Sequence, residues 1–342
     1  MIATAVAPLR IGVIGVGRIG RMHAELIAHQ VPGAALGAVY DAHEPAARTV
    51  SADLGVPAAA GVEEILGSDL DAVAICSSSD THVELMIAAA EAGKAVFCEK
   101  PVSLELAELD RALEAIERAG VPFQIGFNRR FDPGHASVQE AVSSGAVGEP
   151  HLVRISSRDP APPPLDYVKS SGGLFLDMMI HDFDMARFVT GREVVEVFAR
   201  GAVRIDASFA EAGDIDTALV TLVHEDGCLT AIDNSRRAAY GYDQRVEVFG
   251  SEGMAVSENP HGHGGAVVTA TGERRPALPY FFLQRYLPSY IREWSAFVAA
   301  VKAGATPPVS VGDARAPLVI GLAALRSLRE SRPVRLEDVK AA

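Results

Sequence analysis

The chain has 342 residues, enough for two ordinary domains, and apolar residues make up 49% of it, enough to fill their cores. Its formal net charge of −13 argues against a nucleic-acid or anionic-membrane partner, because both bind basic surfaces. Three cysteines, Cys76, Cys98 and Cys228, lack metal-type spacing and are odd in number, which favours a reducing compartment over a disulfide framework.

The N-terminal segment and the hydropathy pattern predict a cytoplasmic protein. Met1 to Pro8 lacks the basic region and the long apolar run of a secretory signal. No uncharged apolar stretch reaches the roughly 18 residues that a membrane-spanning helix needs. We therefore expect neither export nor membrane insertion.

The first predicted strand, residues 9–14, leads straight into a glycine-rich turn, Gly15-Val16-Gly17-Arg18-Ile19-Gly20. A helical pattern from Met22 to His29 follows. This order is that of a dinucleotide-binding fingerprint, in which the first glycine makes the turn, the second admits the pyrophosphate and the third permits close packing. The helix N-terminus would offer N–H groups to the phosphates. A glycine hexad alone is weak evidence, and its context strengthens it.

The second apolar run, residues 34–40, ends in Asp41, which lies 21 residues after Gly20. An acid at this strand end accepts hydrogen bonds from ribose hydroxyls and repels a 2′-phosphate. The alternative is a strand-ending aspartate that begins a turn with Glu44-Pro45. The spacing favours the cofactor role and therefore NAD over NADP.

Helices and strands alternate through the rest of the first 126 residues. Helices are predicted near 45–54, 62–67, 82–92 and 104–119, and strands at 72–76, 95–98 and 122–126. This alternation predicts a parallel, doubly wound sheet, whose ligands lie at the carboxyl ends of the strands. Ser77-Ser78-Ser79 and Glu99-Lys100-Pro101 occupy those ends. Ser79 or Asp80 could equally cap the helix that begins at His82.

Lys100 follows a buried-looking strand and precedes a proline that halts regular structure. An ammonium at a hydride-transfer site can bond a substrate hydroxyl and stabilise the developing alkoxide. Most lysines, however, are solvated surface charges. Spacing alone leaves both interpretations open.

The segment from Gly172 to Asp184 combines apolar residues with acids and a histidine. In a regular helix Asp177, His181 and Asp184 would share one stripe, so Asp177 could orient His181 for proton exchange with a ligand. The intervening residues are apolar, which predicts a largely buried helix. The alternative is an amphipathic helix whose polar residues face water.

The C-terminal half reads as strands followed by helices. Strands are predicted at 194–199, 217–222, 228–232 and 245–250, and helices at 290–302 and 313–330. His261-Gly262-His263 lies in a glycine-rich loop without neighbouring ligands, so we expect a mobile loop and no metal. The aromatic-rich stretch from Phe281 to Tyr290 could be core, interface or a cover for a neighbouring site.

Together these motifs resemble the Gfo/Idh/MocA family of NAD(P)-dependent oxidoreductases. The resemblance covers nearly the whole chain and rests on the glycine turn, on Glu99-Lys100-Pro101, and on Gly172-Gly173 with the acids and histidine that follow. Within the family the chain is most similar to the members that oxidise inositols, through residues 127–132, 176–184 and 234–243.

The resemblance implies a Rossmann domain over residues 1–126 and an α+β domain over 127–342, whose last helix could pack back on the Rossmann domain. The second domain would contain a large, mostly antiparallel sheet, with an open face that assembles homodimers or homotetramers. The implied activity is NAD-dependent oxidation of a cyclitol, myo-inositol to 2-keto-myo-inositol. Oxidation of another polyol or aldose, or a catalytically silent NAD-binding regulator, are the alternatives.

The resemblance also implies a catalytic set of Lys100, Asp177 and His181. His181 would be the general base, Asp177 would hold its tautomer, and Lys100 would polarise the reacting oxygen. The implied cofactor contacts are Gly15, Gly17, Arg18, Ile19, Gly20, Asp41, Ser77, Ser78, His82, Glu99 and Lys100.

Substrate contacts implied by the resemblance also include Arg129, Asp159, Asp184, Tyr240 and Tyr242, which would touch the polyol or shape its pocket. For the first two, an interdomain ion pair or a loop anchor is an equal alternative. The two tyrosines would share one strand face if the segment were extended. The proline-rich residues 160–164 depart from the family pattern and leave the substrate open.

Overall fold

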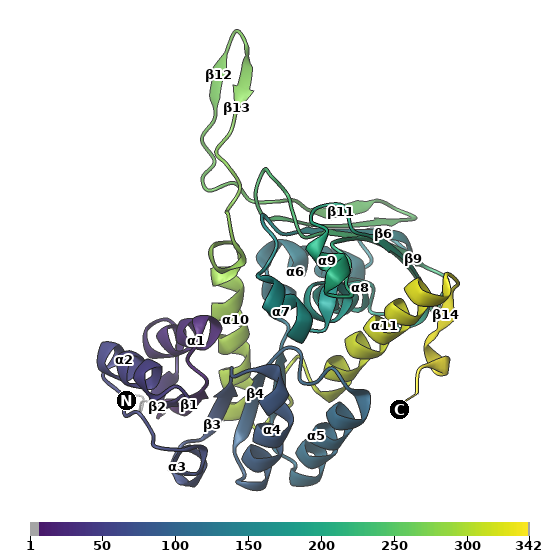
Figure 1. Ribbon diagram of the computed structural model, residues 1–342. Helices are drawn as coiled ribbons and strands as arrows, with labels where there is room; N and C mark the ends of the chain where they lie inside the picture. The colour runs from purple at the N-terminus through teal and green to yellow at the C-terminus, as the bar shows by residue number, and fades with distance from the viewer. Residues whose placement is uncertain (1–6, 341–342) are drawn as a thin grey trace. The chain divides into compact units, whose positions relative to one another are not determined.

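The computed structural model describes residues 7–340, so most of the predicted non-signal segment, Met1 to Val6, lies outside the described residues. The chain forms two compact units (Figure 1). One contains the described residues up to Asn128 together with Tyr290–Arg315, and the other contains Arg129–Ser289 and Ala316–Lys340. Among the helices of residues 7–340, none combines the length and the hydropathy that a transmembrane span requires.

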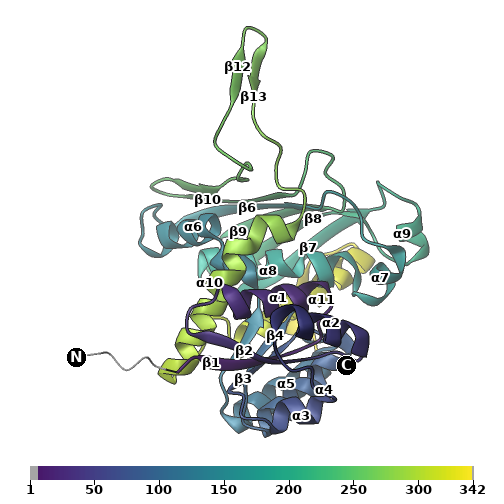
Figure 2. The same cartoon turned by 90° about the vertical axis from the view of Figure 1, so that its left-hand side faces the viewer.

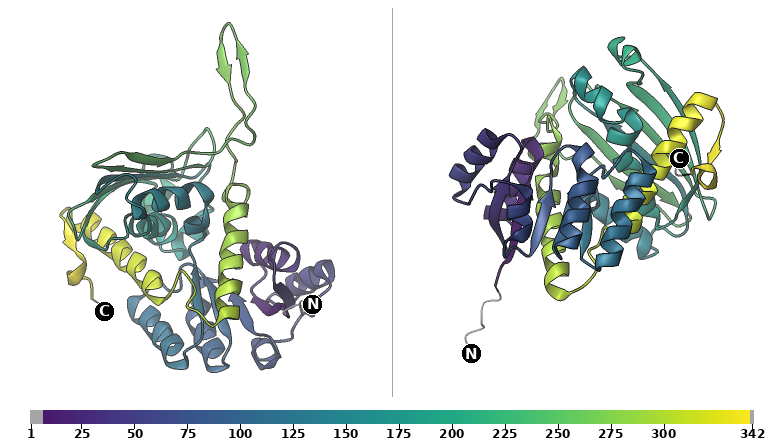
Figure 3. Two further views of the ribbon diagram at one scale, coloured as in Figure 1. Left: turned by 180° about the vertical axis from the view of Figure 1, so that it is seen from behind. Right: turned by 60° about the horizontal axis from the view of Figure 1, so that its bottom comes forward.

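The first unit is built on a parallel sheet with strand order β2-β1-β3-β4-β5. Its strands are β1 Leu9–Ile14, β2 Ala34–Tyr40, β3 Ala72–Ile75, β4 Ala95–Glu99 and β5 Phe123–Gly126. Its helices α1 Arg18–His29, α2 Glu44–Leu54, α3 Val62–Gly67, α4 His82–Glu91 and α5 Leu106–Ala119 flank this sheet (Figure 3). The predicted doubly wound sheet is confirmed, and the order reverses between β1 and β3, where such folds bind ligands.

Helix α5 shows how this unit folds from its sequence. Leu106, Leu109, Leu113 and Ile116 recur at helical spacing and are buried, while the charged residues between them face outward. The helix ends at Gly120, whose φ of 65° gives the left-handed conformation that closes a helix. Strands β3 and β4 are buried at every position, as expected for a parallel sheet covered on both faces.

The second unit contains a seven-stranded sheet with order β11-β10-β6-β9-β8-β7-β14. The strands are β6 Pro150–Arg158, β7 Val194–Ala202, β8 Thr217–His224, β9 Leu229–Ser235, β10 Asp243–Gly250, β11 Met254–Ser257 and β14 Val334–Arg335. Only the β6–β9 pair is parallel among the pairings of this sheet in the described residues, so the predicted mostly antiparallel sheet is confirmed. Strand β6 was not predicted.

Helices cover one face of this sheet (Figure 2). They are α6 Pro133–Ser143, α7 Leu165–Ser170, α8 Ile180–Thr190, the short α9 Ser208–Glu211 and the later part of α11 Val311–Glu330. Inward side chains such as Val153, Ile232 and Val248 pack with Phe183 and Ile320 in one core. The opposite face of the sheet carries the alternate residues, as the two-residue period requires.

Residues 172–184 do not form the single helix that the sequence predicts. A π-helix occupies Leu174–Met178, and α8 begins only at Ile180. The predicted burial is confirmed. Because a π turn holds more residues than an α turn, the regular stripe through Asp177, His181 and Asp184 is interrupted.

The structure also shows the conformation of two segments whose roles the sequence left open. Helix α10 Phe282–Ala303 begins eight residues before the predicted start, and Tyr286 is buried, so part of the aromatic-rich stretch is core. The loop with His261 and His263 leads into a hairpin, β12 Val267–Thr269 and β13 Gly272–Arg274, that projects beyond the sheet (Figures 1 and 2). Residues 7–340 contain no cluster of three or more side chains arranged to hold a metal.

Candidate active site

The glycine turn has the close approaches that a dinucleotide site requires. Gly15 has φ 86°, and a Cβ there would lie 2.5 Å from the backbone of Ser77. A Cβ on Gly20 would collide with the Gly15 carbonyl oxygen, whereas one on Gly17 would meet no atom within 4 Å. Arg18 opens α1, and no side chain caps this helix. The residues therefore fit a pyrophosphate that approaches Gly17 and the helix N-terminus.

Asp41 is anchored to this turn. Its Oδ2 accepts a hydrogen bond of 2.7 Å from the Val16 N–H, and its Oδ1 accepts one of 2.8 Å from the His43 N–H. Each carboxylate oxygen has a second lone pair that can accept a ribose hydroxyl. The contact with His43 matches the turn-forming alternative, and the contact of Asp41 with a ribose stays a prediction.

His82 joins the loops that follow β3 and β4. It is buried, and its Nδ1 and Nε2 lie 2.9 Å and 3.1 Å from the carbonyl oxygens of Pro101 and Ser77. Burial lowers the pKa of His82, so the ring is neutral and donates to one carbonyl at a time. These contacts support the loops, and direct contact between His82 and NAD stays a prediction. Helix α4 has no side-chain cap, so the capping role considered for Ser79 or Asp80 is wrong.

Strand β4 delivers Glu99 and Lys100 to the end of the sheet. The Glu99 carboxylate accepts a hydrogen bond of 3.2 Å from the Lys100 N–H through Oε2, and its Oε1 lies 2.8 Å from His23 Nε2. The peptide between Lys100 and Pro101 is cis. Lys100 is only partly exposed, unlike a typical surface lysine.

In the second unit, Asp177 lies in the π-helix with 8% of its surface exposed. Its Oδ1 accepts a hydrogen bond of 2.8 Å from the Tyr167 hydroxyl, and its Oδ2 accepts one of 3.4 Å from Arg236 Nη1. Both donors favour the ionised carboxylate. His181 stands in the first turn of α8 and is partly buried. The predicted orientation of His181 by Asp177 stays a prediction.

The turn before Asp177 depends on two glycines. Gly172 and Gly173 have φ values of 86° and 74°, and a Cβ on Gly173 would lie 2.6 Å from the Asp214 carboxylate. That carboxylate accepts the Leu174 N–H at 3.1 Å and so satisfies the start of the π-helix. The glycine pair in the motif thus shapes the turn that leads into the π-helix of Asp177.

Two arginines pair with the acids that follow His181. Asp182 is fully buried and accepts hydrogen bonds of 2.8 Å from Arg129 Nη1 and from Asn234 Nδ2. Asp184 accepts from Arg130 through both oxygens, at 2.6 Å and 2.9 Å. The ion-pair alternative for Arg129 is therefore present, but inside the second unit rather than between domains.

Tyr240 and Tyr242 do not share a face, and the prediction that they would is wrong. Gly241 between them has φ 122°, so the segment turns instead of continuing as a strand. Tyr242 is 4% exposed and lies edge-on to Tyr286 at a ring distance of 6.0 Å, whereas Tyr240 is 55% exposed. Asp159, the neighbouring candidate, is held through its backbone N–H by the Ser235 carbonyl at 3.0 Å.

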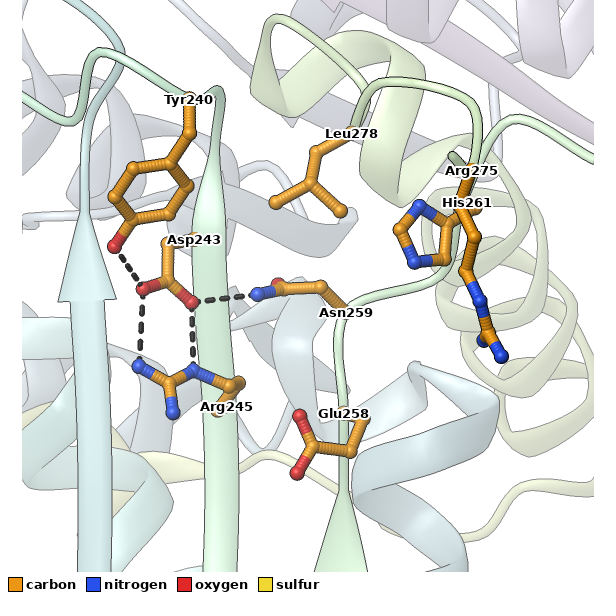
Figure 4. A pocket seen from close by; sticks show the side chains of 8 residues that line it. All are labelled: Tyr240, Asp243, Arg245, Glu258, Asn259, His261, Arg275 and Leu278. Carbon is orange, nitrogen blue, oxygen red and sulfur yellow. Dashed lines mark hydrogen bonds and ion pairs between the residues drawn. The ribbon is translucent and has the colours of Figure 1, made fainter. Parts of the chain in front are cut away.

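Tyr240 lines a polar hollow of about 460 Å³, and its hydroxyl points towards Asp243 (Figure 4). It donates to Asp243 at 2.6 Å and accepts from Arg158 at 2.8 Å. Asp243 is also bonded by Arg245 and Asn259. Its charge is thus neutralised by protein groups, and Tyr240 belongs to this network rather than to the group around Tyr242.

Sequence reasoning missed Tyr167, Arg236, His23 and Trp294. Arg236 falls within residues 234–243, one of the segments that carry the resemblance, so a signal for it was present. The other three are recognised only through tertiary contacts, which the sequence pattern does not show.

Comparisons with known proteins agree with this geometry. Residues 9–127 match the oxidoreductase family with an NAD-binding Rossmann fold, and residues 135–256 match the GFO/IDH/MocA C-terminal domain. Myo-inositol 2-dehydrogenase of Thermotoga maritima is 50% identical over 97% of this chain and 99% of its own. Inositol 2-dehydrogenase of Rhizobium meliloti is 43% identical over 95% and 98%.

A solved structure extends the similarity. Scyllo-inositol dehydrogenase of Lactobacillus casei, with bound NAD(H) and scyllo-inositol, has 30% identity and a TM-score of 0.90 over 97% of this chain and 100% of its own. The chain therefore belongs to the Gfo/Idh/MocA family of oxidoreductases and is an NAD-dependent dehydrogenase, as its motifs predicted.

Proposed function

We propose that this enzyme oxidises a cyclitol with NAD, converting myo-inositol to 2-keto-myo-inositol. The observation that carries the proposal is the 50% identity to a myo-inositol 2-dehydrogenase over 97% of this chain. The buried, doubly hydrogen-bonded Asp177 four residues before His181 supports it, because alcohol oxidation needs a group that removes the hydroxyl proton.

In this proposal His181 is the general base and Asp177 stabilises the imidazolium that forms. Lys100 polarises the alcohol oxygen as negative charge develops on it. NAD, when bound, would supply the hydride acceptor at nicotinamide C4. The glycine turn, Asp41, Ser77 and Ser78 would hold the cofactor.

Substrate contacts form a second part of the proposal. Asp159 and Tyr242 are the candidates for bonds to ring hydroxyls. Arg129 and Asp184 shape the pocket through their ion pairs with Asp182 and Arg130. The exposed position of Tyr240 favours an assembly surface for that residue over a substrate contact.

Oxidation of a different ring isomer is the second candidate. Scyllo-inositol 2-dehydrogenase (NAD(+)) of Bacillus subtilis is 36% identical over 98% of this chain, so members with similar sequences act on another isomer. No such observation favours a silent NAD-binding regulator.

The deciding experiment is a panel of myo-inositol, scyllo-inositol, glucose and acyclic polyols, assayed by NADH formation with His181→Ala as the blank. We expect the highest kcat/KM with myo-inositol. Preference for scyllo-inositol or glucose would establish the second candidate, and no NADH with any alcohol despite tight NAD binding would refute enzymatic oxidation of polyols.

We also propose that the chain forms a homo-oligomer, a dimer or a homotetramer. Supporting features are apolar side chains on the uncovered sheet face, Leu219 and Phe249, and the projecting hairpin with Val268, which is 74% exposed. A two-stranded hairpin is marginally stable alone in water, so a second copy would stabilise it. Light scattering should give a multiple of 36.0 kDa, and Leu219→Arg should lower that mass. A monomer at micromolar concentration would refute this.

A cytoplasmic location is proposed on the chemistry of the thiols. Cys76, Cys98 and Cys228 are buried and free of disulfides. Burial raises the pKa of each thiol, most strongly for Cys76 and Cys98, which suits unreactive packing residues in a reducing compartment. Fractionation of the native source should find the protein with cytoplasmic markers.

A further inference from the structure

A buried chain of hydrogen bonds in the first unit ends at Lys100. Trp294, on α10, places its Nε1 2.8 Å from Nδ1 of His23, on α1. His23 Nε2 lies 2.8 Å from Oε1 of Glu99, and Oε2 of Glu99 accepts the Lys100 N–H at 3.2 Å. Trp294 and His23 are fully buried.

The indole fixes which nitrogen of His23 carries the proton. An indole N–H can only donate, so Nδ1 of His23 must accept with its lone pair. The imidazole is then neutral with its proton on Nε2, and that N–H donates to the Glu99 carboxylate. In the other tautomer, the N–H at Nδ1 would face the indole N–H of Trp294. The lone pair at Nε2 would face the Glu99 carboxylate.

The surroundings hold this arrangement in place. The His23 ring lies 5.4 Å from Phe97 and 5.5 Å from Tyr290 in edge-on contacts, and Trp294 stacks on Phe97 at 4.3 Å. The ring therefore has close neighbours on several sides, which disfavours a flip.

A second buried acid, Glu293, lies near this chain of hydrogen bonds. It does not compete with Glu99 for His23. Burial and the nearby Glu99 raise the pKa of Glu293 well above its ordinary value, so Glu293 is protonated and neutral. Among the described residues its carboxyl oxygens have no hydrogen-bond partner. The negative charge that His23 meets is therefore that of Glu99.

We propose that His23 and Trp294 are positioning residues for Lys100. Trp294 selects the tautomer of His23, His23 holds one oxygen of Glu99, and Glu99 holds the backbone of Lys100 with the other. The inference rests on the proposed catalytic role of Lys100. Neither residue touches the reacting atoms in this scheme, and each acts through the next.

The tautomer gives a test that does not require activity. In protein labelled with [15N]histidine, the His23 ring signals are identified by their loss in His23→Gln. We expect Nδ1 unprotonated and Nε2 protonated in the parent protein. Trp294→Phe removes the donor to Nδ1 while retaining an aromatic ring, so the Nδ1 signal should shift. Because Trp294 is the sole tryptophan, this variant also removes the only indole signal. A proton on Nδ1 in the parent, or an unchanged Nδ1 signal in Trp294→Phe, overturns the proposal.

Two matched variants then separate positioning from packing. The amide nitrogen of His23→Gln can reach the place of Nε2 and donate to Glu99, whereas the shorter His23→Asn keeps only an acceptor for Trp294. We expect His23→Gln to retain kcat within about threefold and His23→Asn to lose tenfold or more, since a hydrogen bond to a charged group is worth about that much. NAD dissociation constants from calorimetry should agree within about twofold.

A packing role would instead lower kcat and melting temperature alike in both variants, and that outcome refutes positioning. If the tautomer is as expected but no polyol yields NADH, the proposed function fails while the assignment of the tautomer stands. If polyols are oxidised but the tautomer differs, the positioning proposal alone fails.

Discussion

The Tyr167 hydroxyl donates a hydrogen bond of 2.8 Å to Oδ1 of Asp177. Tyr167 lies on α7, which begins directly after the proline-rich residues 160–164, and Pro164 is the N-cap of that short helix. Prolines restrict φ and so limit the directions in which the helix can leave β6. The segment that departs from the family pattern therefore positions a donor on the acid proposed for catalysis.

Tyr167→Phe should lower kcat by about three- to tenfold, because it removes a donor that favours ionised Asp177, and one such bond is worth about 1 kcal/mol. The melting temperature should change little, since Tyr167 is 46% exposed. Steady-state assays at saturating NAD and polyol check this. Tyr280→Phe, which alters another exposed tyrosine of the second unit, should match the parent. An unchanged kcat in Tyr167→Phe would separate this tyrosine from the chemistry.

His181→Ala should lose most turnover while still binding NAD. Removal of a general base typically costs about 100- to 10,000-fold in rate. Turnover is measured by NADH formation, and NAD binding by calorimetry, where the dissociation constant should stay within about twofold of the parent. His29→Ala, at an exposed site on α1, is the control. Near-normal turnover in His181→Ala would remove this residue from the mechanism.

The Rossmann unit could be predicted because its signals are local. The glycine turn, the periodic apolar residues and the strand-ending Asp41 are each read within a few neighbouring residues. Strand β6 escaped prediction because its inward face includes the polar Ser157 and its parallel partner β9 begins at Leu229, far along the chain. Such pairing depends on tertiary context more than on local pattern.

The candidate site was predictable in part for the same reason. The spacing of Asp177 and His181 was visible, but the π-helix that holds Asp177 was not. That turn depends on the Asp214 carboxylate, 40 residues away, accepting the Leu174 N–H. Tyr240 and Tyr242 were misplaced because the period-2 argument assumed a strand where Gly241 makes a turn.

Asp41→Ser should weaken the binding of NAD and reduce the preference of the enzyme for NAD over NADP. The variant removes the carboxylate that can accept ribose hydroxyls and also its bond to the Val16 N–H. We expect kcat/KM for NAD to fall about tenfold or more while that for NADP falls less or rises. Asp69→Ser, at an exposed site of the same unit, is the matched control and should leave both unchanged. Equal efficiency of the parent enzyme with NAD and NADP would contradict the role given to Asp41.

His135 should make the stability of the protein fall in mild acid. Burial lowers the pKa of His135 to about 3, whereas an unfolded histidine has a pKa near 6.5. Between these values the unfolded chain binds a proton that the folded chain does not. The stabilisation is therefore complete above about pH 6.5 and is lost progressively as the pH falls towards about 3. Burial also lowers the pKa values of His82 and His224, which adds in the same direction.

His135→Gln should reduce by one the number of protons that the unfolded chain binds in mild acid and the folded chain does not. Urea denaturation at pH 7, 6 and 5 should show the free energy of unfolding falling less steeply in the variant, by on the order of 1 kcal/mol per pH unit below about pH 6.5. His29→Gln, which replaces an exposed histidine, is the matched control and should keep the slope of the parent. If His135→Gln also keeps the parent slope, His135 titrates alike in the folded and unfolded chains and burial does not exclude its proton.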